Sequence, residues 1–155
     1  MEKAIYFDMD GTIANFYGVK NWFECLVSHD ETPYRVAKPL WHMSSLMEVL
    51  QSLKEEGYRI GVITWLSKET SPDFDKKVRA AKADWLQVYG LSSLLDEIHM
   101  VKYGTPKHTT ANLRHGILVD DNAEVRMKWE RYGGVTIDPI REDIIMSLKK
   151  LLKGE

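Results

Sequence analysis

Residues 3–12 read KAIYFDMDGT, a short apolar run that ends in two acidic residues, a glycine and a threonine. An apolar run of this length, without polar alternation, is typical of a strand buried on both faces of a parallel sheet. Ligands of such sheets bind beyond the carboxyl ends of the strands. Asp8 and Asp10 therefore stand where the chemistry of the protein is expected.

On the C-terminal side of this segment, apolar runs alternate with amphipathic stretches. The further predicted strands are residues 59–64, 97–101, 116–119 and 134–137. The predicted helices, whose apolar side chains recur at helical spacing, are residues 40–56, 72–89, 123–132 and 141–152. Strands that alternate with helices indicate an α/β fold: a three-layer, doubly wound (Rossmann-like) parallel sheet of about five strands.

One segment departs from this alternation. Residues 13–38 separate the first predicted strand from the first regular helix, which is too long for a plain loop. Its aromatic residues are Phe16, Tyr17, Trp22, Phe23 and Tyr34. We interpret it as a small cap, inserted after the first strand beside the site, within a single domain that spans residues 1–155.

Composition excludes several classes of protein. The 155 residues are 44% hydrophobic and 28% charged, as in one globular domain, and the net charge of -2 argues against a general nucleic-acid binder. The single cysteine, Cys25, excludes an intramolecular disulfide framework and a multi-cysteine zinc site. No apolar run approaches the ~20 residues that cross a bilayer, and the N-terminal run is too short for a signal peptide. We therefore expect a cytoplasmic protein without a membrane partner.

Polar residues of a consistent kind follow four of the predicted strands. They are Asp8 and Asp10 after the first, Thr64 at the end of the second, Lys102 or Lys107 after the third, and Asp120-Asp121 after the fourth. Because the carboxyl ends of parallel strands meet at one edge of the sheet, these side chains are expected to lie together.

In this order the motifs resemble those of the haloacid dehalogenase (HAD) superfamily of phosphohydrolases. The matched pieces are Asp8-Met9-Asp10-Gly11-Thr12, Thr64 after an apolar strand, a lysine, and the Asp120-Asp121 pair. Within the superfamily the chain resembles the 5'(3')-deoxyribonucleotidase group. That likeness rests on the cap after the first strand, on the helix with Lys82 and Trp85, and on ILVDDN at residues 117–122. The cap is shorter than is usual in that group.

The resemblance implies a Mg²⁺-dependent phosphomonoesterase that works through an aspartyl-phosphate. Asp8 would be the nucleophile, and Asp10, which an extended backbone points to the same side, would be the general acid and base. Mg²⁺ would be bound by the carboxylates of Asp8 and Asp120 and by the backbone carbonyl of Asp10. This ion prefers few carboxylates together with phosphate oxygens and waters. Thr64 would donate a hydrogen bond to a phosphate oxygen, and the lysine would neutralise charge.

The remaining site residues have supporting roles in this interpretation. Gly11 would free the turn so that backbone amides approach the phosphate, and Thr12 would either assist or stabilise that turn. Asp121 would support the metal from outside its ligand shell or through a water. Trp65 would either line the pocket or pack beneath it.

The lysine of the third motif is the least determined of these residues. Lys107 is favoured over Lys102, because a Thr-Pro-Lys turn that opens a helix is how the family usually presents it. Lys82 is interpreted as a solvated residue of its helix. The five histidines show no metal-ligand spacing and are interpreted as non-catalytic.

The predicted substrate is a small phosphate monoester, with nucleoside and deoxynucleoside monophosphates favoured by the resemblance. A sugar phosphate is an alternative, and so is a phosphorylated nucleic-acid end, although the acidic balance argues against the latter. A phosphate-binding or signalling module without catalysis is a further alternative. The motif order differs from that of a response-regulator receiver, and the sequence has no GxxxxGKS/T motif of a P-loop kinase. A small cap leaves an open site, which either admits larger substrates or is completed by a second subunit in a homodimer.

Overall fold

The computed structural model describes residues 2–154, which form a five-stranded, fully parallel sheet. The strands are β1 (Lys3–Phe7), β2 (Tyr58–Trp65), β3 (Glu97–Val101), β4 (Ile117–Val119) and β5 (Val135–Ile137). Their spatial order is β3-β2-β1-β4-β5, so the direction of winding reverses between β1 and β4. The predicted doubly wound α/β fold is confirmed.

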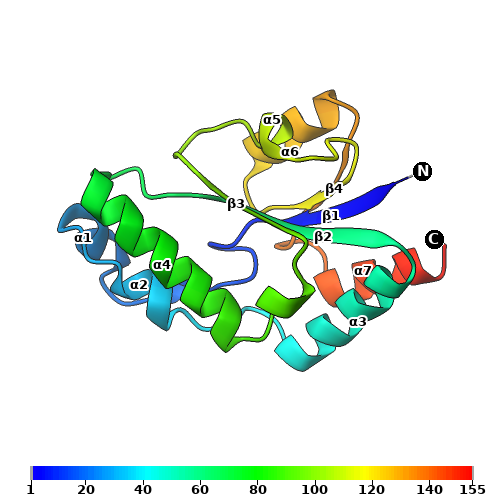
Figure 1. Cartoon of the computed structure of the whole chain (residues 1–155), viewed down its shortest axis with the longest axis horizontal. Helices are drawn as coiled ribbons and strands as arrows, with labels where there is room; N and C mark the ends of the chain where they lie inside the picture. Colours follow the sequence, from blue (N-terminus) through cyan, green and yellow to red (C-terminus); the bar gives the residue numbers. More distant parts are fainter. Residues whose placement is uncertain (1, 155) are drawn as a thin grey trace.

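Helices cover both faces of the sheet (Figure 1). On one face lie α3 (Met43–Glu55), α4 (Pro72–Val88) and α7 (Ile144–Leu152), and on the other lie α5 (Lys107–Thr110) and α6 (Ala123–Arg131). The last helix begins later than the predicted residue 141, because Asp143 caps it by accepting from the backbone amides of Ile145 and Met146. Among residues 2–154, no helix is long and apolar enough to cross a membrane.

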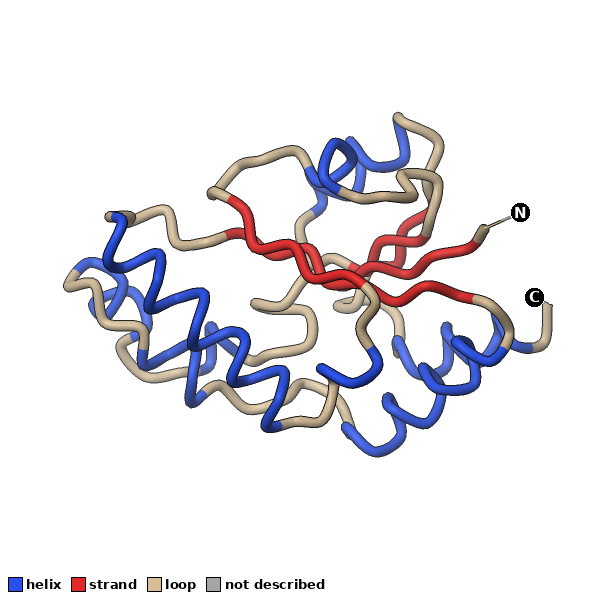
Figure 2. Tube along the Cα trace, viewed as in Figure 1, coloured by secondary structure: helices blue, strands red, loops and turns tan. Residues whose placement is uncertain are grey.

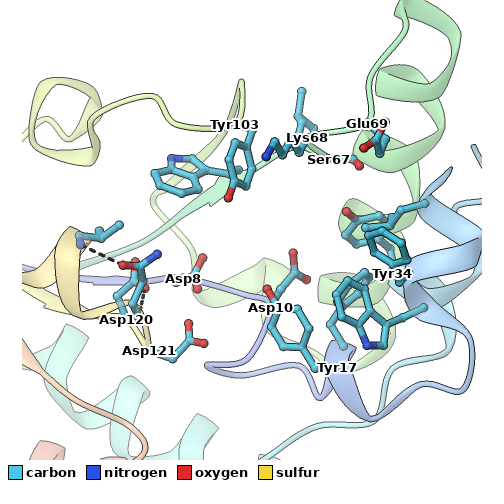
Figure 3. A pocket seen from close by; sticks show the side chains of 18 of the residues that line it. Asp8, Asp10, Tyr17, Tyr34, Ser67, Lys68, Glu69, Tyr103, Asp120 and Asp121 are labelled. Carbon is cyan, nitrogen blue, oxygen red and sulfur yellow. Dashed lines mark hydrogen bonds between the residues drawn. The ribbon is translucent and has the colours of Figure 1, made fainter.

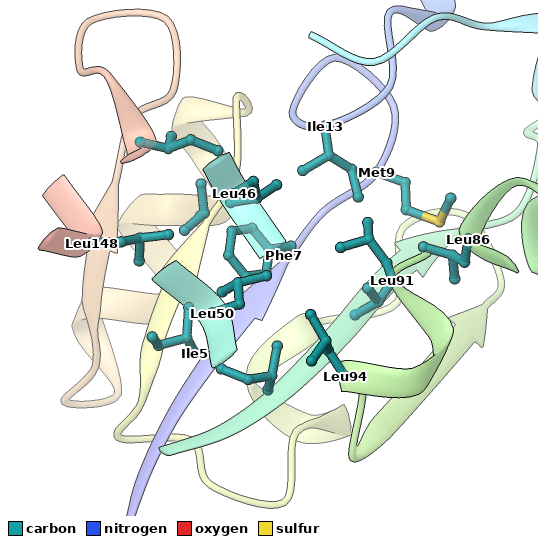
Figure 4. Packing of buried hydrophobic residues seen from close by; sticks show 14 of the residues in the cluster. Ile5, Phe7, Met9, Ile13, Leu46, Leu50, Leu86, Leu91, Leu94 and Leu148 are labelled. Carbon is teal, nitrogen blue, oxygen red and sulfur yellow. The ribbon is translucent and has the colours of Figure 1, made fainter. Parts of the chain in front are cut away.

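Successive side chains of β1 are buried on opposite faces of the sheet. Ile5 and Phe7 belong to the core cluster beneath α3 and α7, where they pack with Leu50 and Leu148 (Figure 4). Tyr6 belongs to a second cluster beneath α6. Burial on both faces explains why this strand has no polar alternation in its sequence.

The segment of residues 13–38 leaves the sheet and returns to nearly the same place. It contains a 3-10 turn, η1 (Phe16–Gly18), and two short helices, α1 (Trp22–Val27) and α2 (Thr32–Val36). The backbone amide of Asn15 donates to the carbonyl oxygen of Lys38 at 2.7 Å, which joins the two ends. Figure 2 shows the segment beyond the carboxyl ends of the strands, on the side away from the chain termini.

This segment is held by packing against α4. Helix α2 contacts α4, and the side chains of Phe16 and Tyr34 are buried in one cluster with Phe74 of α4. The segment is therefore fixed beside the carboxyl edge of the sheet by apolar burial.

A buried polar network crosses the middle of β2. The hydroxyl of Tyr6 donates to Glu97 Oε2 at 2.8 Å, and Glu97 also contacts Arg59 and His99. Gly61 lies between the two strands, paired in register with Tyr6 on one side and Glu97 on the other. A Cβ at Gly61 would lie 2.7 Å from Tyr6 Cδ1, so only glycine leaves room for this contact.

Replacing Gly61 with alanine is expected to destabilise the protein by about 1–3 kcal/mol, because the added methyl group overlaps the ring of Tyr6 in a packed interior. Thermal unfolding followed by circular dichroism should show a lower Tm. The exposed variant Ser93→Ala should unfold at the wild-type temperature. An unchanged Tm for Gly61→Ala would mean that the strands can separate around β2 without cost.

Candidate active site

The carboxyl ends of β1 and β4 meet at the edge of the sheet. The backbone amide of Asp8, directly after β1, donates to the carbonyl oxygen of Val119 at 2.9 Å. Asp120 and Asp121 follow Val119 in the chain. The three acidic residues therefore lie at the switch point of the strand order, where ligands of such sheets bind.

Three carboxylates form a compact cluster at this point. Asp8, Asp120 and Asp121 each offer one oxygen, and these oxygens lie within 4.8 Å of one another. Carboxylate oxygens completed by water are the ligands that hard divalent cations prefer, so this donor set fits such an ion. The side chain of Asp10 is not part of the cluster, and the use of its backbone carbonyl as a ligand stays a prediction.

The ammonium group of Lys107 lies between two of these carboxylates. Its Nζ donates to Asp8 Oδ1 at 2.9 Å and to Asp120 Oδ2 at 2.7 Å. Lys107 is the first residue of α5 and is 4% exposed, whereas Lys102 is exposed to solvent. Of the two candidate lysines, Lys107 is the one that contacts the acidic cluster.

The cluster is electrostatically crowded. Burial and the neighbouring Asp8 raise the pKa of Asp120 to about 6, although Lys107 opposes the rise. Burial, Asp8 and Asp120 raise the pKa of Asp121 to about 7. Burial by itself would lower the pKa of Lys107, but Asp8 and Asp120 raise it above the ordinary value. A further cation would relieve the repulsion among these carboxylates.

Gly11 and Thr12 form the turn after β1, against which the carboxylate of Asp121 packs from the turn after β4. Gly11 has a φ of +80°, and a Cβ there would lie 2.4 Å from Asp121 Oδ2, so both conformation and space require glycine. The buried hydroxyl of Thr12 lies 3.2 Å from Asp8 Oδ2 and 3.2 Å from Asp121 Oδ1, and it accepts from the backbone amide of Asp121. Thr12 therefore ties the turn after β1 to the turn after β4.

Asp10 is held by a second lysine. Lys82 Nζ donates to Asp10 Oδ2 at 3.0 Å, to Thr64 Oγ1 at 2.6 Å and to the carbonyl oxygen of Trp65 at 2.8 Å. These bonds use all three donors of the ammonium group. The interpretation of Lys82 as a solvated residue is wrong, since its side chain is 1% exposed. Burial raises the pKa of Asp10, and Lys82 opposes only part of that rise.

Thr64 lies at the predicted edge of the sheet but is fully buried. Its hydroxyl oxygen accepts from Lys82, so its own proton stays available for donation. The donation to a phosphate oxygen stays a prediction.

A pocket of about 310 Å³ opens above these groups. The carboxylates of Asp8, Asp10, Asp120 and Asp121 line its floor (Figure 3). Lys107 lines the pocket as well. Trp65 lines the pocket rather than packing beneath it, and its indole nitrogen donates to the carbonyl oxygen of Thr105 at 2.8 Å.

The walls of the pocket are largely aromatic. One wall comes from the segment of residues 13–38, and its aromatic members are Phe16, Tyr17, Trp22, Phe23 and Tyr34. The opposite wall is made by Trp65 and Tyr103, whose ring centroids lie 5.0 Å apart. A bound molecule would therefore have charged groups beneath it and aromatic rings on two sides.

Sequence reasoning missed Lys82, Ser67 and Tyr103 as residues of the site. A signal existed for Lys82, which lies four residues after Val78 and three before Trp85 and thus on the apolar face of α4. No spacing in the sequence distinguishes Ser67 or Tyr103, because both lie in loops.

No protein-family model and no curated protein matches the sequence. Solved structures of HAD-family proteins are similar in fold. A predicted HAD-like family hydrolase from Porphyromonas gingivalis has 18% identity and a TM-score of 0.59 over 98% of both chains. D,D-heptose 1,7-bisphosphate phosphatase from Burkholderia thailandensis has 17% identity and a TM-score of 0.54, over 86% of this chain and 75% of that one.

A HAD family enzyme from Bacteroides thetaiotaomicron, crystallised with magnesium and inorganic phosphate, has 8% identity and a TM-score of 0.52. That match covers 89% of this chain and 94% of the other. The protein therefore has the α/β, Rossmann-like fold of HAD enzymes, as the motif resemblance implied. At these identities the similarity concerns the fold.

Replacing Lys82 with methionine is expected to destabilise the protein by about 3 kcal/mol, because it leaves the largely buried carboxyl group of Asp10 without its partner. Adding Asp10→Asn should recover much of the loss, since it removes the unpaired charge. The matched control is Lys76→Met, at an exposed position of the same helix. Chemical unfolding of the wild type, the two single variants and the double variant measures these free energies. A double variant no more stable than Lys82→Met would contradict the prediction.

The metal-free protein is expected to lose stability as the pH rises from about 5 to 8. Asp120 and Asp121 have raised pKa values in the folded state, so folding favours their protonated forms and that advantage disappears as the pH passes about 6 to 7. Mg²⁺ should raise the Tm more at pH 8 than at pH 5.5.

At ten times its dissociation constant a cation adds about 1.4 kcal/mol, or roughly 3–6 °C for a domain of this size. Differential scanning fluorimetry with Mg²⁺ against EDTA measures this shift, with NaCl of equal ionic strength as the control. The extra gain at pH 8 should disappear in Asp120→Asn. A Tm gain that is the same at both pH values would contradict the cation site.

Proposed function

We propose that this protein is a Mg²⁺-dependent phosphomonoesterase of the HAD type that works through an aspartyl-phosphate on Asp8. One observation carries the proposal. The carboxylate of Asp8 shares a cation-fitting cluster with Asp120 and Asp121, pairs with Lys107, and faces a pocket that Asp10 also lines. A nucleophile, counter-charges and a proton donor are the groups that phosphoryl transfer needs.

The proposed metal ligands are Asp8, Asp120 and the backbone carbonyl of Asp10, with Asp121 as a further carboxylate of the cluster. When bound, Mg²⁺ would neutralise negative charge on these carboxylates and on the phosphate oxygens. The crystal structure of the enzyme from Bacteroides thetaiotaomicron with magnesium and phosphate supports this proposal. Lys107 supplies positive charge to the same carboxylate of Asp8.

In the first step an oxygen of Asp8 attacks phosphorus, and the bond from phosphorus to the leaving oxygen breaks. Asp10 gives its proton to that oxygen, so the products are an alcohol and an aspartyl-phosphate. In the second step a water attacks phosphorus and gives a proton to Asp10. The bond between Asp8 and phosphorus then breaks, which releases phosphate and restores both carboxyl groups.

The other residues of the site position these groups. Lys82 holds Asp10 and Thr64, and we assign to Thr64 the donation of its free proton to a phosphate oxygen. Gly11 leaves room for the carboxylate of Asp121 beside the turn after β1, and Thr12 ties that turn to the backbone of Asp121. Electrostatic groups arranged before the substrate arrives are the largest source of catalysis in many enzymes.

The favoured substrates are nucleoside and deoxynucleoside monophosphates, as in the 5'(3')-deoxyribonucleotidase group. The aromatic wall supports this choice, because aromatic side chains stack on planar bases. Residues 13–38 act as the cap in this proposal, and a second subunit could complete the open side of the pocket. We propose a cytoplasmic enzyme, as expected from the sequence.

Replacing Asp8 with asparagine is expected to reduce phosphate release at least about 10³-fold, because the amide cannot act as the nucleophile. The assay measures phosphate from nucleoside 5'- and 3'-monophosphates, sugar phosphates, a 3'-phosphorylated oligonucleotide and an aryl phosphate, each with Mg²⁺. Asp73→Asn, at an exposed position of α4, is the matched control and should retain full activity.

Each result of this assay decides one part of the proposal. Turnover of nucleotides that disappears in Asp8→Asn supports both the mechanism and the substrate. Turnover confined to other phosphate esters keeps the mechanism and rejects the nucleotide. Turnover that survives in Asp8→Asn, or no Mg²⁺-dependent turnover at all, rejects the phosphatase in favour of a binding module.

A further inference from the structure

Ser67 has a buried hydroxyl group that its protein neighbours do not satisfy. The residue follows β2, lines the pocket and is 5% exposed. Its Oγ has no hydrogen-bond partner within residues 2–154. Leaving a buried hydroxyl unpaired costs free energy, and a ligand hydroxyl bound in the adjoining pocket would remove that cost by pairing with it.

Tyr34 presents a second hydroxyl group to the same part of the pocket. It comes from α2 and is also 5% exposed. Its ring lies 4.6 Å from the ring of Phe16 and 5.0 Å from the ammonium group of Lys82, so its position is fixed on two sides. Burial and Asp10 raise the pKa of Tyr34, and Ser67, whose hydroxyl lies beside that of Tyr34, opposes the rise. The two hydroxyl groups do not meet the distance and angle limits of a direct hydrogen bond.

These two residues lie on the side of Asp10 that faces away from the carboxylate cluster. In Figure 3, Asp120, Asp121 and Asp8 gather at one end of the pocket, and Asp10 stands between them and the pair of Tyr34 and Ser67. In the proposed reaction Asp10 protonates the leaving oxygen. The two hydroxyl groups are therefore placed next to the leaving alcohol rather than next to the phosphate.

We propose that Ser67 and Tyr34 form a subsite for a hydroxyl group of the leaving alcohol, close to the ester oxygen. This inference rests on the proposed phosphomonoesterase and defines its substrate class: phosphate esters of hydroxylated alcohols, either nucleosides or sugars and other polyols. The subsite joins the segment of residues 13–38 to the sheet, because Tyr34 comes from the former and Ser67 from the loop after β2.

The charge and hydrogen-bonding capacity of the subsite favour a hydroxyl group over an anionic or an apolar substituent. A hydroxyl group can both donate and accept, which matches the serine and tyrosine hydroxyls. An anionic substituent would gain no partner from Lys82, because all three donors of that ammonium group already bond to Asp10, Thr64 and Trp65. An apolar substituent would leave Ser67 unpaired and would lose binding energy.

The test uses pairs of substrates that differ in hydroxyl groups. The nucleoside pair is thymidine 5'-monophosphate and its 3'-deoxy analogue, and the polyol pair is glycerol 3-phosphate and propyl phosphate. Ser67→Ala should lower kcat/KM about fivefold or more for the hydroxylated member of the relevant pair. It should lower kcat/KM less than about twofold for the member without the hydroxyl, because that member makes no bond to Ser67.

Tyr34→Phe should show the same selectivity, and it keeps the proposal testable if Ser67→Ala folds poorly. Ser93→Ala, exposed and outside the pocket, should leave all four values unchanged. The affected pair identifies the leaving group as a nucleoside or a polyol.

Equal losses on both members of each pair, or no loss on any, would overturn the subsite. Failure of the proposed function gives a different result. In that case the wild-type protein would release no phosphate from any of the four esters, or turnover would survive in Asp8→Asn. Either result would reject the subsite together with the proposed function.

Discussion

The salt bridge of Lys107 with Asp8 and Asp120 is the interaction on which the site depends. Two carboxylates from neighbouring strands meet at the switch point of the sheet, with Asp121 close beside them. Crowded negative charge of this kind destabilises a fold unless a cation offsets it. The strand order places the acidic residues together, and Lys107, the first residue of α5, offsets their repulsion.

A second lysine divides the pocket floor into two electrostatic compartments. Lys107 donates hydrogen bonds to Asp8 and Asp120, whereas Lys82 donates to Asp10 and Thr64. Two carboxylates that are only two residues apart in the chain thus have different partners. Separate environments are how carboxyl groups of one site come to have different chemical roles. This division supports the proposed roles of a nucleophile and a proton donor.

In the proposed enzyme, the reacting groups and the groups that select the substrate come from different parts of the chain. The charged groups follow the strands, whose packing on both faces leaves them little freedom. The aromatic wall that includes Tyr34 comes from residues 13–38, which apolar contacts hold against α4. The pocket therefore joins charged groups that the sheet holds to an aromatic wall that apolar contacts hold.

The sequence by itself determined the fold class and the identity of most charged groups of the site. Continuous apolar runs and helical spacing are local patterns, and the acids follow the strands directly, so neither needs knowledge of distant contacts. Only the tertiary structure decided which lysine pairs with which carboxylate. Lys82 meets Asp10 across 72 residues of chain, and Lys107 meets Asp8 across 99. A pairing of that kind depends on how the elements pack, which no local spacing encodes. The unpaired hydroxyl of Ser67 likewise became visible only when the surrounding side chains were in place.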